Sequence, residues 1–227
     1  MYKQYYKDIC YKTGGEPSIY WDEIYKDNDT WQAITGDYET KVKWIYCRFY
    51  ECLYKPVSAM LNCRDKSDDV AIKEVFADIA LIGCASLLQG CEALGRFVNG
   101  KGYITSSGNK FNAESFNAFV EEYLLKGAKI DSALSKNELR DILREGFRNS
   151  LAHGLFVLKG GLSASNGELL AWKQGTNRTV ISFEILLKLF KIGMDKYFAV
   201  LLELNSDKKR DFEDAFNNYV EHVKAKG

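Results

Sequence analysis

Apolar residues recur at three- and four-residue spacing along most of the chain, which predicts a mainly helical protein. The chain has only two prolines, so long segments lack helix breakers, and Pro56 is expected to end or kink the first helix. Ser67, Ser135 and Ser206 each precede an apolar periodic run and are expected to cap a helix. Gly127 is expected to stop the helix before it. Helices are therefore expected over 38–53, 67–98, 116–124, from 135 onward, over 183–204 and from 206 onward.

The spacing changes after His153-Gly154, where three short apolar runs are typical of strands. These runs are Leu155–Leu158, Glu168–Trp172 and Thr179–Phe183, and KGGLSASNG and KQGTNRT are expected to be the turns between them. The Gly- and Ser-rich stretch 99–110 is expected to be a mobile loop. The predicted fold is all-α (mainly), a helical bundle with a small β-hairpin or three-strand insertion. The core face of the long helix is expected to include Ile72, Val75, Phe76, Ile79, Ile82 and Leu94.

Charge and composition limit the partners that the chain can have. Its 227 residues contain 31 Lys and Arg and 31 Asp and Glu, so any contact with nucleic acid must come from a local patch. Ten of the 14 tyrosines and three of the four tryptophans lie in the first 55 residues. These aromatics either pack on the bundle or form a platform for stacking bases. We expect residues 1–66 to form an aromatic-rich helical extension and residues 67–227 to form the main helical domain.

Several classes of protein are disfavoured for lack of the required residues. The apolar stretch Phe76–Leu88 contains Asp78 and is too short to span a bilayer, and the first ten residues have no apolar core of a secretory signal. Six cysteines without a CxxC pair and only two histidines disfavour a zinc site, and we expect no metal or cofactor. Reduced cysteines without a secretory signal indicate a cytoplasmic protein. The chain has no GxxxxGK[ST] and no GxGxxG opening a helix, so nothing indicates a glycine-rich nucleotide-binding loop. It also has no GxSxG, which disfavours a Ser-His-Asp enzyme.

Basic residues recur every four positions before the strand region, so a helix places them in one slightly slanted row. The row consists of Lys136, Arg140, Arg144 and Arg148. Asp141 and Glu145 stand three residues before Arg144 and Arg148, so the row can be explained by surface ion pairs, each worth well under about 1 kcal/mol. The alternative is a local basic track that contacts an RNA backbone.

Arg148, Asn149 and His153 gather where this helix is expected to end, directly before Gly154. Asn149 and His153 lie about 40° apart around a helix, whereas Arg148 lies about 140° from His153. Arg148 and His153 can therefore act together only if the helix ends near Ala152. The structural alternative is a histidine stabilised at a helix C-terminus, with Arg148 in an ion pair.

The sequence Arg148-Asn149-Ser150-Leu151-Ala152-His153 resembles the RxxxxH motif of the HEPN (higher eukaryotes and prokaryotes nucleotide-binding) superfamily, including the polar residue after the arginine. The stretch Ser86–Gly95 resembles the long early helix of such domains, and the acidic residue that supports the motif there corresponds to Glu92. The resemblance covers about Ser67 to the C-terminus. The strand region and the first 55 residues are not part of the minimal family pattern.

The resemblance implies a metal-independent endoribonuclease of a defence, toxin–antitoxin or RNA-processing system, with two motifs meeting across a homodimer axis. Arg148 would hold the scissile phosphate, because its planar fork matches two oxygens, and His153 would transfer protons. Asn149 would orient His153 or bind the phosphate, and a neutralising partner protein would restrain the enzyme. The row Lys136, Arg140 and Arg144 would bind the RNA backbone.

Two other functions stay open at this stage. The first is a non-catalytic HEPN-like module that binds a nucleotide, RNA or a protein partner, and the neutral net charge agrees with it. The second is a ligand- or partner-binding helical bundle in which the motif is a coincidence. The other histidine, His222, is expected to be a solvated cation near the end of the last helix.

Overall fold

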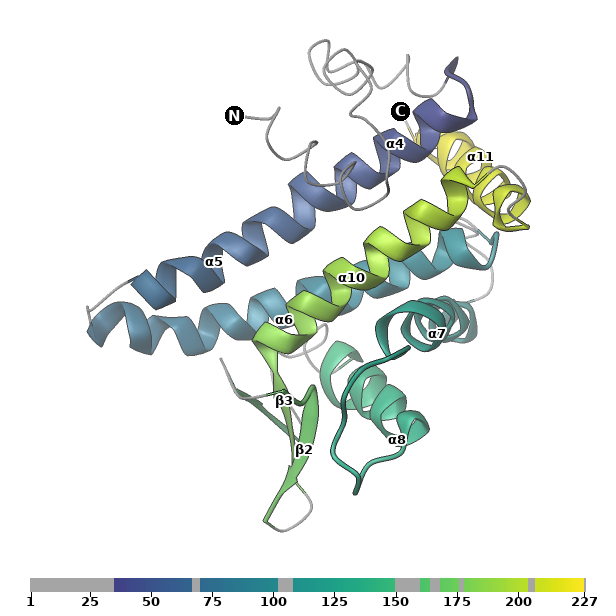
Figure 1. The fold of residues 1–227 in the computed structure, drawn as a ribbon. Helices are drawn as coiled ribbons and strands as arrows, with labels where there is room; N and C mark the ends of the chain where they lie inside the picture. The colour runs from purple at the N-terminus through teal and green to yellow at the C-terminus, as the bar shows by residue number, and fades with distance from the viewer. Residues whose placement is uncertain are drawn as a thin grey trace.

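The computed structural model describes residues 35–66, 70–101, 108–149, 160–163, 168–175, 178–203 and 207–226. The described part is mainly helical with one small three-stranded sheet, as the sequence predicts (Figure 1). The α-helices are α4 (Tyr38–Phe49), α5 (Lys55–Lys66), α6 (Val70–Val98), α7 (Gly108–Phe119), α8 (Lys136–Asp141), α10 (Phe183–Leu202) and α11 (Lys208–Lys226). Three π-helical segments extend them: η1 (Tyr50–Tyr54), η2 (Val120–Leu124) and η3 (Ile142–Asn149).

Helix α6 is the central element of the fold. It packs against α5, α7, α10, α11 and η3, and its residues Cys84, Leu87, Leu88 and Leu94 are fully buried. The segment Ala80–Val98 is long and apolar enough to cross a membrane, judged by length and composition alone. The stretch Phe76–Leu88, considered from the sequence, is shorter and contains Asp78. Because 61% of this segment is buried inside the protein, its apolar character is explained by its place in the core.

One expected core residue of α6 lies on the surface instead. Ile82 is 51% exposed, whereas Leu94 is buried as expected. The prediction for Ile82 is wrong. Ala80 and Cys84, each two residues away, are buried, and a step of two residues turns about 200° around the helix, so Ile82 lies on the opposite, exposed side. The side chains of the other four expected core residues, at 72, 75, 76 and 79, lie outside the described part of the chain.

The described aromatic residues of the N-terminal region contribute to the common core. Trp44 makes an edge-to-face contact with Phe216 of α11, with ring centroids 6.1 Å apart. Tyr46 packs in the same way against Phe198 of α10 at 5.2 Å, and its hydroxyl donates to Asp195 at 2.8 Å. For these residues the packing interpretation applies, because burial of their rings joins α4 to both C-terminal helices.

Pro56 was expected either to end or to kink the first helix, and it does not end the helical run. Helix α5 begins at Lys55 and continues to Lys66, so Pro56 lies in its first turn. The π-helical segment η1 lies directly before it, and the backbone N–H of Lys55 donates to the carbonyl of Tyr50. A proline in the first turn of a helix removes no bond of that helix, and the change of winding occurs at η1.

Helices α6 and α7 approach each other most closely at Gly95. A Cβ atom built on Gly95 would lie 1.6 Å from the backbone oxygen of Ser115, and Ser115 is itself fully buried. Only a residue without a side chain allows the two backbones to come this close. Gly95 therefore fixes the distance between α6 and α7.

We expect Gly95→Ala to destabilise the protein by about 3 kcal/mol, because the methyl group meets backbone that cannot rotate away. Gly146→Ala is the matched control, since a Cβ there meets nothing closer than 3.8 Å and the change favours a helix by up to about 1 kcal/mol. Urea unfolding of both variants measures the difference. Equal stability of the two variants would contradict the close approach at Gly95.

The sheet has the strand order β1–β3–β2, with β1 (Gly160–Ser163), β2 (Ala171–Gln174) and β3 (Arg178–Ser182). Strand β1 runs parallel to β3, and β2 runs antiparallel to it. Strand β1 lies in the segment KGGLSASNG, which the sequence analysis wrongly assigned to a turn. A Cβ on Gly160 would lie 2.7 Å from the Phe147 ring, so this glycine allows the strand to pack against η3. The expected strand Leu155–Leu158 lies outside the described residues.

Several of the remaining predictions of helix boundaries agree with the structure, but the helix expected to begin at Phe116 begins at Gly108. Gly127 has φ +87° and follows the end of the helix formed by α7 and η2, and Ser182 caps α10, the helix expected over 183–204. Residues 108–110 of the expected loop belong to α7. The expected caps Ser67 and Ser206 lie outside the described residues. Both helices that they were expected to begin, α6 and α11, are present.

Candidate functional site

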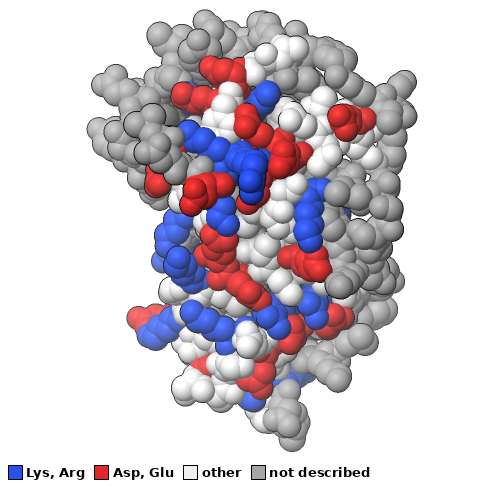
Figure 2. Space-filling model, turned by 90° about the vertical axis from the view of Figure 1, so that its right-hand side faces the viewer, with Lys and Arg blue, Asp and Glu red and all other residues white. Residues whose placement is uncertain are grey.

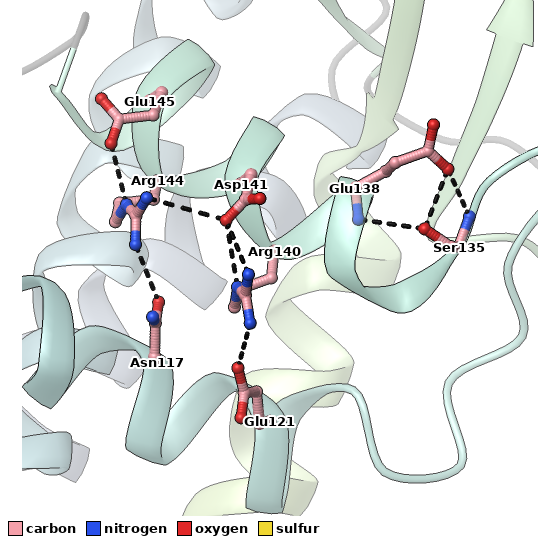
Figure 3. Close-up of polar contacts among 8 residues, drawn as sticks. All are labelled: Asn117, Glu121, Ser135, Glu138, Arg140, Asp141, Arg144 and Glu145. Atoms are coloured by element: carbon pink, nitrogen blue, oxygen red, sulfur yellow. Dashed lines mark hydrogen bonds and ion pairs between the residues drawn. The ribbon is translucent and has the colours of Figure 1, made fainter.

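A capping box at Ser135 sets the start of the helix that carries the basic row. The Ser135 hydroxyl accepts from the backbone N–H of Glu138 at 3.1 Å, and the Glu138 carboxylate accepts from the Ser135 N–H at 2.8 Å (Figure 3). The Ser135 N–H and hydroxyl, which both donate to this carboxylate, lower the pKa of Glu138 below its ordinary value. Leu139, Leu143 and Phe147 are fully buried, as their four-residue spacing predicts. With this side anchored in the core, the three arginines of the row contact η2, α7 and α6 in turn.

Glu92 of α6 and Arg148 of η3 form an ion pair, although 56 positions separate them in the sequence. Glu92 is only 6% exposed, and each of its two oxygens holds an arginine. Arg148 Nη2 contacts Oε2, and Arg96 Nη2 contacts Oε1 at 3.0 Å. Arg96 also donates to Asn112 of α7 at 3.2 Å. A buried carboxylate thus joins two arginines from two elements.

The Arg148 guanidinium has one further partner and one unpaired nitrogen. Its Nη1 donates to the side-chain oxygen of Asn149 at 2.8 Å, and the Asn149 amide nitrogen donates to Glu145 at 2.8 Å. Its Nε is buried and has no hydrogen-bond partner among the described residues. The side chain as a whole is 19% exposed, and its contacts with Glu92 and Asn149 hold the guanidinium in a fixed orientation.

Arg140 and Arg144 belong to an ion-pair network (Figure 3). Arg140 pairs with Glu121 of η2 and with Asp141 at 3.0 Å, and the hydrogen bond to Glu121 raises the pKa of Arg140. Arg144 lies 2.9 Å from Glu145, 3.7 Å from Asp141 and 3.4 Å from the Asn117 amide oxygen. In this structure the surface ion-pair interpretation therefore describes these two arginines, and they do not present a track of unpaired cations.

The basic row accordingly lacks a strong field of one sign. Lys136 is exposed and forms no ion pair with a described residue. Basic and acidic side chains are interspersed over the face that Figure 2 shows, and among the residues coloured there neither sign forms a continuous patch. An RNA contact at Arg140 or Arg144 would have to displace or share their ion pairs.

Two cavities meet at Arg148. The smaller one, of about 260 Å³, is mostly polar and lies between α7 and η3, where Asn112, Arg144 and Asn149 also line it. The larger one, of about 590 Å³, lies between α4 and α6 and is also lined by Glu92 and Arg96. An arginine at the junction of two cavities is placed to bind a phosphate whose neighbouring groups extend into both.

The structure thus brings together three of the residues singled out from the sequence, which are Glu92, Arg148 and Asn149. The fourth, His153, lies with Ser150–Gly154 outside the described residues, so its distance to Arg148 is not defined. His222 is half-buried in α11 and lines neither of these two cavities. Within the described part of the chain, no group of three His, Cys, Asp or Glu side chains is arranged to hold a metal ion.

Two members of the site, Arg96 and Asn112, were not predicted from the sequence. Arg96 stands four residues after Glu92, so the helical spacing of an ion pair was present in the sequence as a signal. No local signal identifies Asn112, because its position depends on how α7 crosses α6.

Comparison with protein-family models, with curated proteins and with solved structures finds no match to this chain.

Proposed function

We propose that the protein is a metal-independent endoribonuclease of the HEPN type that acts in the cytoplasm as a homodimer. The pairing of Arg148 with Glu92 is the observation that best supports this function. It joins the arginine of the RxxxxH motif to a buried acidic residue of the long central helix, as the resemblance implies. The mainly helical fold and the π-helical winding at Arg148 also support it, since such winding is frequent at functional sites.

In this mechanism Arg148 binds the scissile phosphate. Glu92 and Asn149 orient its guanidinium, so little conformational freedom is lost when RNA binds. The phosphorane gains negative charge during the reaction, and the fixed guanidinium stabilises this charge in a partly buried site. Glu92 is a positioning residue here. Asn149 orients Arg148, in addition to orienting His153 or binding the phosphate as predicted from the sequence.

The proton transfers are assigned to His153. The ribose 2′-oxygen attacks phosphorus, the bond from phosphorus to the 5′-oxygen breaks, and the products are a 2′,3′-cyclic phosphate and a free 5′-hydroxyl. One imidazole accepts the proton of the 2′-hydroxyl, and a second gives a proton to the leaving 5′-oxygen. Each chain supplies one His153, so the partner subunit's His153 completes the pair when the two motifs meet at a two-fold axis.

The first experiment is cleavage of a mixed RNA pool in EDTA by the wild-type protein. We expect products with 2′,3′-cyclic phosphate ends, and we expect Arg148→Lys to lose most of this activity because an ammonium group cannot reproduce the planar fork. Arg210→Lys is the matched control, because Arg210 is exposed on α11 and lines neither cavity. Thermal melts and mass measurement verify that fold and oligomeric state are unchanged.

A purified wild-type protein that cleaves none of the RNA would contradict the proposal. The alternative is then a non-catalytic module that binds RNA, a nucleotide or a protein. Two observations agree with that alternative: the neutral net charge, and the fact that Arg148 already uses two of its nitrogens within the protein. RNA and nucleotide affinity of the same variants would then be measured. A neutralising partner is proposed only as a restraint that an active nuclease requires.

A further inference from the structure

The cavity between α4 and α6 has the aromatic walls of a stacking site. Trp44 and Phe49 line it from α4, and Phe97 lines it from α6. The rings of Phe49 and Phe97 are in edge-to-face contact, with centroids 6.4 Å apart, so each is held in place by the other. Trp44 and Phe97 are almost fully buried, and Phe97 already stacks on Phe212. The half-buried Phe49 therefore presents the ring surface on which a planar ligand can stack in this cavity of about 590 Å³.

The same cavity is positively charged, although the chain as a whole has a net charge of zero. Its charged lining residues are three arginines and one glutamate, which gives a formal charge of +2. Arg96 and Arg148 share Glu92, whereas Arg48 forms no ion pair with a described residue. Arg48 is exposed, and its Cζ lies 5.6 Å from the centre of the Trp44 ring. A planar anion is the ligand class that fits such a lining.

Polar groups of α6 lie at the same cavity. The Gln89 side chain is exposed and offers both a donor and an acceptor. The Ser86 hydroxyl donates to the carbonyl of Ile82 at 2.8 Å, so only its lone pairs are available to a ligand. An amide and a hydroxyl at one wall can bind the edge of a ring that stacks on the aromatic walls.

We propose that this cavity binds a nucleobase of single-stranded RNA, next to the phosphate that Arg148 holds. The proposal rests on the proposed function and adds a substrate subsite to it. Aromatic side chains stack on bases, arginines bind the adjoining phosphates, and Gln89 contacts the base edge. Because the cavity adjoins Arg148, the base that it binds belongs to a nucleotide beside the cleaved bond. The cavity thus selects unpaired RNA, since a paired base cannot leave its helix without cost.

Cys52 provides a readout of this cavity that does not depend on cleavage. It is exposed and lines the cavity, whereas Cys47, Cys84 and Cys91 are buried. Burial raises the pKa of Cys84 to about 12 and raises that of Cys91 as well, so these thiols stay protonated and unreactive. Iodoacetamide labelling followed by peptide mass analysis therefore reports access to the cavity at Cys52.

The test compares two uncleavable oligonucleotides of equal length, one of 2′-O-methyl RNA with all bases and one with an abasic sugar–phosphate backbone. We expect the first to protect Cys52 and the second to leave it reactive. Arg48→Ala should require about tenfold more RNA for the same protection, because a charge-assisted contact is lost. The control Arg210→Ala removes an equally exposed arginine outside the cavity and should require no more RNA than the wild type.

Equal protection by both oligonucleotides, or protection by neither, would overturn the proposed base site. A thiol at Cys52 that does not react in the free protein would also overturn it, since the cavity would then be closed. The proposed function can fail separately. Base-dependent protection without any cleavage would contradict the nuclease and leave the base site in place. Cleavage without base-dependent protection would contradict the base site and support the nuclease.

Discussion

Replacement of His153 by alanine is expected to lower the rate of RNA cleavage by about 10²–10⁴-fold, because the dimer then loses both imidazoles and no side chain exchanges a proton with either reacting oxygen. The other histidine of the chain offers a matched control. His222→Ala removes the same side chain from α11, outside both cavities, and should leave the rate unchanged. Single-turnover cleavage of a defined RNA by the two variants measures the difference.

The same variant tests whether two chains build one site. When wild-type and His153→Ala chains are co-expressed in equal amounts, about one quarter of the dimers contain two intact chains if pairing is random. A shared site then predicts about one quarter of the wild-type activity, whereas independent sites predict about one half. Full activity of the pure His153→Ala protein, with an unchanged fold, would refute the mechanism outright.

Glu92→Gln is expected to lower the free energy of unfolding by about 3–5 kcal/mol, because it removes the charge that compensates two arginines in a largely buried site. Glu121→Gln is the control, since Glu121 pairs with Arg140 but is 51% exposed, and its loss should cost less than about 1 kcal/mol. Urea unfolding with an unchanged slope measures both values. The substitution is nearly isosteric, so the charge is the main difference.

A double-variant cycle separates the ion pair from other effects of the Gln substitution. If the destabilisation comes from an uncompensated guanidinium, Arg148→Met should restore part of the stability in the Glu92→Gln background. Additive losses in the double variant would show that Glu92 and Arg148 do not interact. A Glu92→Gln variant as stable as Glu121→Gln would show that the carboxylate contributes nothing beyond a surface ion pair.

The sequence predicted those parts of the fold that depend on neighbouring residues. Ser135 and Glu138 specify a helix start by themselves, and Gly127 specifies a stop, because each acts through the backbone within a few residues. The strand at Gly160 was missed for the opposite reason. Gly160 is required because a side chain there would meet the Phe147 ring and β3. The sequence alone does not distinguish a glycine needed for packing against distant residues from a glycine needed for a turn.

The candidate site shows the same division. The resemblance singled out Glu92 and Arg148, and in the structure the two form an ion pair across 56 positions. The base-binding cavity was not predictable, because Arg48 and Phe49 reach Arg148 only through the packing of α4 against the bundle. The π-helical winding of η3 was also missed, since the apolar spacing of Leu139, Leu143 and Phe147 is compatible with an α-helix.

The close approach at Gly95 gives a signature for recognising related chains. Gly95 lies between Glu92 and Arg96, so one turn of α6 carries the carboxylate, the contact point of α7 and the second arginine. A substitution at this glycine would shift α7 and with it Asn112, the partner of Arg96. The observed contacts couple Glu92 and Arg96 of the pattern Glu-x-x-Gly-Arg to Arg148 and Asn149 of the pattern Arg-Asn-x-x-x-His, which follows about fifty residues later in the sequence. A search with both halves together should be far more selective than either short motif alone.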